Sequence, residues 1–234
     1  MKLVFWGKYI DTYVTGTLHR FEDLVREPVH YMLVEESFSR RNLTGGQPDK
    51  PESWITILHN QAFFKQSDQI LENNKDAVHV FLSFWGDKRL FRVLLRALWH
   101  RHSVAVIFEP YATVPYGYWK EEGWLVSHLK VLGRHIAYRM LWPLLRLATR
   151  GKLPCVLAVS PLAEEQLRRV GFQREVLYPF GYFVERKECG KLKLEQGQPL
   201  HVLYSGSLIM RKGLDIAIAA VREVNRDGIR VLFD

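Results

Sequence analysis

The chain has 234 residues, a formal net charge of +8, 47% hydrophobic residues and 13% aromatic residues. This composition supplies enough apolar side chains for a packed core and excludes a disordered chain. The two cysteines, Cys155 and Cys189, are too few and too far apart for a disulfide framework or a metal cluster.

The N-terminal segment lacks the long apolar run of a signal peptide. The most hydrophobic stretch, residues 131–149, is interrupted by arginine and histidine and is too polar to span a bilayer. We therefore expect a cytoplasmic protein, either soluble or peripheral on the inner face of the plasma membrane.

Short apolar runs bounded by turn-forming or polar residues predict buried strands along most of the chain. They lie at residues 2–6, 30–35, 54–58, 77–84, 104–108, 156–159 and 176–178. Apolar residues at three- and four-residue steps predict amphipathic helices over 88–102 and 125–150, the second kinked near Pro143. A further helix is predicted from Pro161 to about Val170.

Strands that are apolar on both faces and alternate with amphipathic helices are typical of a parallel sheet covered on both sides. We predict an α/β fold with a Rossmann-like doubly wound sheet over 1–184, whose ligands lie at the carboxyl ends of the strands. Residues 185–199 are polar and resemble a linker. Residues 200–234 hold one strand-helix-strand unit, too small to bury its own faces, so we expect the truncated start of a second Rossmann-like domain.

The segment LYSGSLIMRKGLDIAIAAV, residues 203–221, places a glycine turn between a strand and a helix. The free N–H groups of such a turn and the positive end of the helix dipole suit a diphosphate, and two basic residues, Arg211 and Lys212, stand at the same end. This segment resembles the opening of the donor domain in family 4 retaining glycosyltransferases. The segment at 156–181, with its strand, serine, helix and Pro-x-Gly turn, resembles the end of the first domain in that family.

The resemblance implies a GT-B glycosyltransferase of polysaccharide biosynthesis. Such an enzyme moves a sugar from a nucleotide-diphosphate donor to a hydroxyl of a glycan or lipid-linked acceptor, with retention and without a metal or other cofactor. It also implies that Gly206, Ser207, Arg211 and Lys212 bind the donor diphosphate and that Lys212 stabilises it as it leaves. Ser207 stands where the family commonly has an arginine, so either Arg211 supplies the second positive charge or the donor is held more weakly. The Glu-x7-Glu pair of the family would lie beyond Asp234, and we expect this chain alone to be inactive.

Five further residues follow predicted strands and are candidates for the acceptor side of a cleft. Glu109 follows strand 104–108, where a carboxylate can accept hydrogen bonds from sugar hydroxyls, or can simply cap neighbouring amides; we give it a catalytic role. The other four, which we place at the acceptor cleft, are Gly7, Lys8, Tyr9 and Trp85. For Gly7 there is a physical reason for this placement, because a backbone that approaches a ligand closely has no room for a Cβ atom. Trp85 either stacks on a sugar ring or belongs to the core or its rim.

Seven Lys and Arg residues against two Glu give residues 119–152 a local charge of +5. On the helix over 125–150, one face carries Leu125, Leu129, Leu132, Ile136 and Met140. The opposite face is expected to carry a basic stripe of His135, Arg139, Trp142, Arg146 and Arg150. Such a stripe either is solvated or contacts an anionic membrane surface.

No helix-turn-helix, ribonucleoprotein motif or zinc finger is present, so a nucleic-acid partner is not expected. The sequence also lacks a Walker A loop and a Gly-x-Gly-x-x-Gly fingerprint, which argues against a P-loop NTPase and an ordinary dehydrogenase. Two alternatives stay open: a non-catalytic membrane-binding module in polysaccharide assembly, and a GT-B sugar epimerase.

Overall fold

The computed structural model describes residues 1–8, 12–34, 54–82, 84, 87–113, 123–149, 153–183, 199–203, 213–228 and 230–233. The chain forms two compact units. The first comprises Met1–Tyr111 and Tyr138–Glu185, and the second comprises Ala112–Ala137 and Arg186–Asp234. Residues 112–137, which the sequence analysis placed in the first domain, therefore belong to the second unit, and most of the expected linker lies outside the described residues.

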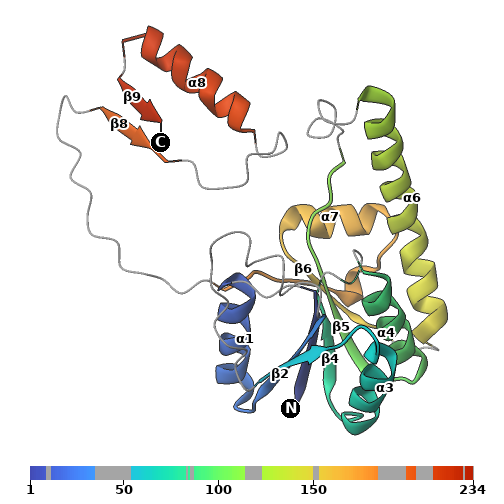
Figure 1. Cartoon of the computed structure of the whole chain (residues 1–234). Coiled ribbons are helices and arrows are strands. Elements are labelled where there is room, and N and C mark those ends of the chain that lie inside the picture. The colour runs from blue at the N-terminus through green and yellow to red at the C-terminus, as the bar shows by residue number, and fades with distance from the viewer. Residues whose placement is uncertain are drawn as a thin grey trace. The chain divides into compact units, whose positions relative to one another are not determined.

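The first unit is built on a seven-stranded, all-parallel sheet in the order β3-β2-β1-β4-β5-β6-β7 (Figure 1). Its strands are β1 (Leu3–Gly7), β2 (Val29–Val34), β3 (Ile55–Leu58), β4 (Val78–Phe81), β5 (Ser103–Phe108), β6 (Cys155–Ala158) and β7 (Leu177–Pro179). The chain runs from β1 outward to β3, returns to β4 beside β1, and then runs outward in the other direction. This order confirms the predicted α/β, Rossmann-like doubly wound fold and puts its switch point between β1 and β4.

Alternate side chains of each strand enter two separate cores, one on each face of the sheet. The larger core takes Val4 and Trp6 of β1 and is covered by α3 (Phe63–Asn73), α4 (Lys88–Trp99), the second half of α6 (Trp124–Thr149) and α7 (Pro161–Arg169). The smaller core takes Leu3 and Phe5 and is covered by α1 (Thr12–Val25). In Figure 1 α1 lies on one side of the sheet and α3 and α4 lie on the other. A single turn of 3₁₀ helix, η3 (Arg174–Val176), leads into β7.

The orientation of α6 differs from the prediction. The side chains that pack into the core are Tyr138, Leu141, Trp142 and Leu145, while the predicted apolar face is exposed. The reason is that the second half of the helix carries two apolar sets at three- and four-residue steps, and only one of them can face the sheet.

The second unit contains β8 (Leu200–Val202), α8 (Leu214–Arg226) and β9 (Val231–Phe233), and the two strands pair in parallel. The helix begins at Leu214, as expected for the residue after a Lys-Gly step. None of the α8 side chains is buried, so this strand-helix-strand unit has little core of its own.

Candidate functional site at the carboxyl edge of the sheet

All seven strands of the sheet end on one edge, because they run parallel. Lys8 leaves β1 at this edge, and Leu82, which leaves β4, donates its backbone N–H to the Trp6 carbonyl at 2.8 Å. These two chain segments flank the switch point, where ligands of open α/β sheets bind. Glu109 leaves β5 at the same edge. The edge therefore brings together the ends of strands that are far apart in the sequence.

Glu109 is exposed and has a defined partner at this edge. The Tyr182 hydroxyl donates a hydrogen bond to Glu109 Oε1 at 3.0 Å. Tyr182 follows β7, and its ring packs edge-on against Phe180 at 5.7 Å between centroids. A carboxylate held in this way keeps its position while offering an acceptor to a ligand hydroxyl.

The segment that carries Tyr182 is tied to the sheet and to α1. The Phe180 N–H donates to the Ala158 carbonyl at 2.8 Å, and the Phe180 ring stacks on Phe21 of α1. The Phe183 N–H donates to Thr17 Oγ1 at 2.9 Å. Tyr182 was not predicted from the sequence, although the Pro-x-Gly turn immediately before it indicates that the chain bends back over the edge.

Gly7 is buried at the end of β1, and its lack of a side chain has a cause inside the fold. A Cβ atom at this position would lie 1.9 Å from the Tyr31 hydroxyl oxygen and 2.7 Å from the ring carbon that bears it. The space that the sequence analysis assigned to a ligand is thus filled by Tyr31 of β2. Lys8 is half-buried beside it, whereas Tyr9 and Trp85 lie outside the described residues.

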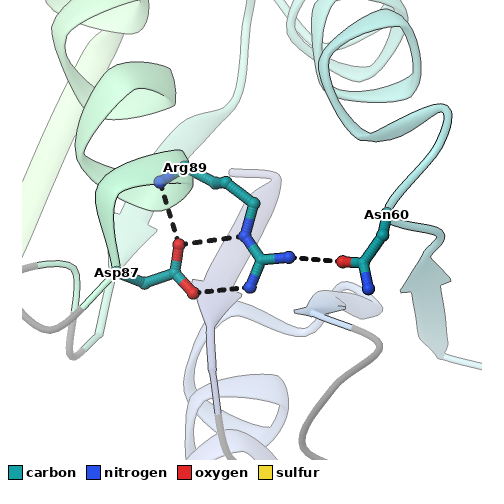
Figure 2. Close-up of polar contacts among 3 residues, drawn as sticks. All are labelled: Asn60, Asp87 and Arg89. Atoms are coloured by element: carbon teal, nitrogen blue, oxygen red, sulfur yellow. Dashed lines mark hydrogen bonds and ion pairs between the residues drawn. The ribbon is translucent and has the colours of Figure 1, made fainter.

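A second polar cluster joins the ends of β3 and β4 (Figure 2). Asp87 caps α4 by accepting the Arg89 N–H at 2.9 Å, and it also binds the Arg89 guanidinium at 3.1 and 2.8 Å. The other terminal nitrogen of Arg89 donates to Asn60 Oδ1, which follows β3. Figure 2 shows the guanidinium bridging the two side chains.

The charge of Asp87 is stabilised by this geometry. Burial favours the neutral acid, but the hydrogen bonds from the Arg89 side chain and backbone, together with the Leu90 N–H, outweigh it and lower the pKa of Asp87. An ionised carboxylate at the start of a helix is also favoured by the helix dipole. This cluster was not predicted from the sequence, although an aspartate directly before an apolar helical pattern indicates a helix cap.

The chain after β5 is anchored to α7. The Gln166 side-chain amide donates to the Tyr111 carbonyl and accepts the Tyr111 N–H, both at 2.9 Å. Tyr111 also stacks on Tyr138 of α6 at 4.2 Å between ring centroids. Because both backbone groups of Tyr111 are held, Glu109 leaves the sheet in a fixed direction.

The residues proposed to bind the donor diphosphate, Gly206, Ser207, Arg211 and Lys212, lie outside the described residues. The structure does describe the helix that follows them. Its N-cap is Gly213, with a left-handed φ of 70°. Gly213 also accepts the Ala217 N–H at 3.0 Å, which closes the first turn of α8.

The predicted basic stripe of α6 is only partly exposed. His135, Arg139 and Arg146 are exposed, and Arg150 lies outside the described residues. Trp142 is 4% exposed and packs on Phe172 at 4.7 Å between ring centroids, so it is a core residue and does not reach the surface. The expectation that Trp142 contacts a membrane is therefore wrong.

Within the described ranges, no three His, Cys, Asp or Glu side chains are grouped closely enough to hold a metal ion. Among the helices that the structure describes, none is both long and apolar enough to cross a bilayer. Comparison of the chain with models of known protein families, with curated proteins and with solved structures gives no match.

Proposed function

We propose that the chain is part of a retaining GT-B glycosyltransferase that transfers a sugar from a nucleotide-diphosphate donor to a hydroxyl acceptor. The Rossmann-like sheet by itself does not carry this proposal, because such sheets support many chemistries. The observation that carries it is the start of α8 directly after Lys212-Gly213, inside the segment that resembles the donor domain.

The start of α8 has the physical properties that a diphosphate requires. The first turn of a helix presents backbone N–H groups that have no partner within the helix, and the helix dipole adds partial positive charge there. Arg211 and Lys212 come immediately before this turn in the sequence and add two full positive charges. Together these groups would stabilise the negative charge that develops on the leaving diphosphate.

The proposed reaction breaks the bond between the anomeric carbon of the donor sugar and the diphosphate oxygen. The electron pair leaves with the nucleoside diphosphate, and the acceptor oxygen bonds to the anomeric carbon on the same face of the sugar. The proton of the acceptor hydroxyl passes to the leaving phosphate oxygen. Lys212 would stabilise that oxygen, and Glu109, positioned by Tyr182, would accept hydrogen bonds from sugar hydroxyls.

The test is sugar transfer by the protein that carries this chain, with a panel of nucleotide sugars and with Lys212→Ala. Loss of one transition-state charge partner typically costs on the order of 100-fold or more in turnover. The matched control is Arg222→Ala, which removes an exposed basic side chain more than two turns into the same helix. We expect the control to keep parental turnover and both variants to keep the parental circular dichroism spectrum.

If Lys212→Ala retains turnover within a few-fold of the parent, Lys212 is not the diphosphate residue and the motif alignment is wrong. If the parent protein binds no nucleoside diphosphate and transfers no sugar, the non-catalytic alternative replaces the transferase. A change in sugar configuration without transfer would instead identify an epimerase.

A further inference from the structure

Two consecutive residues of α1, Gly16 and Thr17, hold the chain segment that carries Tyr182. Thr17 is 2% exposed, and its Oγ1 accepts the backbone N–H of Phe183 at 2.9 Å. A Cβ atom on Gly16 would lie 2.7 Å from the Phe183 carbonyl oxygen, so the helix approaches the segment too closely for any other residue at this position. Glycine inside a helix is unfavourable relative to alanine, and the close contact accounts for its presence here.

The same segment, residues 180–183, is fixed at its other end as well. The Phe180 N–H donates to the Ala158 carbonyl of β6 at 2.8 Å, and the Phe180 ring stacks on Phe21, one turn further along α1 than Thr17. The Tyr182 ring packs edge-on against Phe180. Tyr182 therefore lies between an anchor on the sheet and an anchor on α1.

The hydroxyl of Tyr182 then restrains the side chain of Glu109, to which it donates at 3.0 Å. The bonds between Gln166 and Tyr111 hold the backbone two residues further on, but they leave the side-chain torsions of Glu109 open. Ordering a long, exposed side chain when a ligand binds costs conformational entropy. A hydrogen bond that orders the carboxylate before the ligand arrives reduces that cost.

We propose that Thr17 and Gly16 are positioning residues that act on Glu109 through the segment 180–183. The inference rests on the proposed function, in which Glu109 accepts hydrogen bonds from sugar hydroxyls. All of these residues belong to the first unit, and Thr17 is buried within it, so its effect on a ligand is indirect. Without the bond from Phe183 to Thr17, the Tyr182 hydroxyl would lose its fixed place, and Glu109 would adopt side-chain conformations that do not meet the ligand.

The test is sugar transfer by the protein that carries this chain, compared with three variants of α1. Thr17→Val keeps the shape of the side chain but removes the acceptor oxygen, so kcat/KM for the acceptor should fall about 10-fold, on the scale of one lost hydrogen bond. Thr17→Ser keeps a hydroxyl and should stay within a few-fold of the parent. Gly16→Ala should lower kcat/KM as Thr17→Val does, because its Cβ atom displaces Phe183. In all three variants KM for the nucleotide sugar should stay within a few-fold of the parental value.

The matched control is Thr149→Val on α6. Thr149 is 1% exposed, and its hydroxyl donates to the Arg146 carbonyl of the same helix at 2.9 Å. This variant also loses a buried threonine hydroxyl, but it should keep the parental kcat/KM. A double-mutant cycle separates positioning from a general effect on the fold: in a Glu109→Ala background, Thr17→Val should cause little further loss of kcat/KM.

The proposal would be overturned if Thr17→Val and Thr149→Val lose activity equally, or if Thr17→Val costs as much in the Glu109→Ala background as in the parent. Full activity of Glu109→Ala would also overturn it, and this outcome would leave the proposed function to be decided by Lys212→Ala. Should Thr17→Val fail to fold by circular dichroism, Gly16→Ala takes its place in each comparison.

A parent protein that transfers no sugar would contradict the proposed function, and positioning would then be decided by NMR. The resonance to follow is that of the Glu109 carboxyl carbon, assigned by its loss in Glu109→Ala. We expect it to shift in Tyr182→Phe and in Thr17→Val, and to keep its parental position in Thr17→Ser and Thr149→Val. If it shifts in Tyr182→Phe and not in Thr17→Val, Thr17 does not position Glu109.

Discussion

Acidification should destabilise this fold through one buried histidine, His79 of β4, whose side chain is fully buried. The Trp6 indole Nε1 lies 3.1 Å from His79 Nδ1, and His79 Nε2 lies 3.1 Å from the Asn74 carbonyl oxygen. Indole nitrogen only donates, so Nδ1 must accept, and the proton of the neutral ring sits on Nε2 and is donated to Asn74. A second proton on Nδ1 would break the bond to Trp6.

The pKa of His79 is lowered from 6.5 to about 4, first by burial and then by the nearby His102, against a smaller opposing effect of the Asn74 carbonyl. On acidification the unfolded chain therefore takes up a proton below pH 6.5, while the folded chain does so only near pH 4. The stability present above pH 6.5 is lost progressively down to about pH 4. The total loss is about 3 kcal/mol, of which about 2 kcal/mol has gone by pH 5.

The assay is urea unfolding of the parent, His79→Gln and His59→Gln proteins, followed by far-UV circular dichroism at pH 8, 7, 6 and 5. Because other groups also titrate, the quantity compared is the free energy of unfolding that each protein loses between pH 8 and pH 5. His79→Gln should lose about 2 kcal/mol less than the parent. His59→Gln, which replaces an exposed histidine, should behave like the parent. Equal losses in the parent and His79→Gln would refute the reasoning.

Two further substitutions test the carboxyl edge by the free energy of unfolding. Gly7→Ala should cost about 2 kcal/mol, because its Cβ atom would lie 1.9 Å from the Tyr31 hydroxyl. Adding Tyr31→Phe to Gly7→Ala should recover part of that loss. The control Gly133→Ala, which has open space around its Cβ atom, should cost nothing. If the effects of Gly7→Ala and Tyr31→Phe on the free energy of unfolding simply add, the two residues do not clash. Asp87→Ala should cost about 2 kcal/mol through loss of the helix cap and its guanidinium partner, and Asp87→Asn should cost less. Asp68→Ala breaks the more exposed ion pair with Arg96 and should cost under about 1 kcal/mol. If Asp68→Ala and Asp87→Ala cost the same, Asp87 has no special role.

The sheet was predictable because each strand is a short apolar run in the sequence. The strand over 104–108, for example, is buried along its whole length, which is typical of a strand in a sheet that is covered on both faces. The helices over 12–25 and 63–73 were not singled out, because in both the apolar residues alternate with many polar ones. Those two helices depend on packing against the sheet, which their local sequence pattern does not show.

The candidate site was predictable only where topology determines it. The position of Glu109 at the carboxyl edge follows directly from the parallel sheet. Its partner Tyr182 lies 73 residues away, and the anchoring bond from Phe183 to Thr17 spans 166 residues. Contacts of such separation depend on the packed fold and leave no pattern in the local sequence.

The misreading of α6 has a specific physical cause. Periodicity shows that a helix has an apolar face, but the same three- and four-residue steps occur in a face that enters the core and in a face that stays exposed. Here both kinds occur on one helix: Leu141 and Leu145 are buried, whereas Leu132 and Ile136 are exposed. Burial, which the sequence does not contain, distinguishes them.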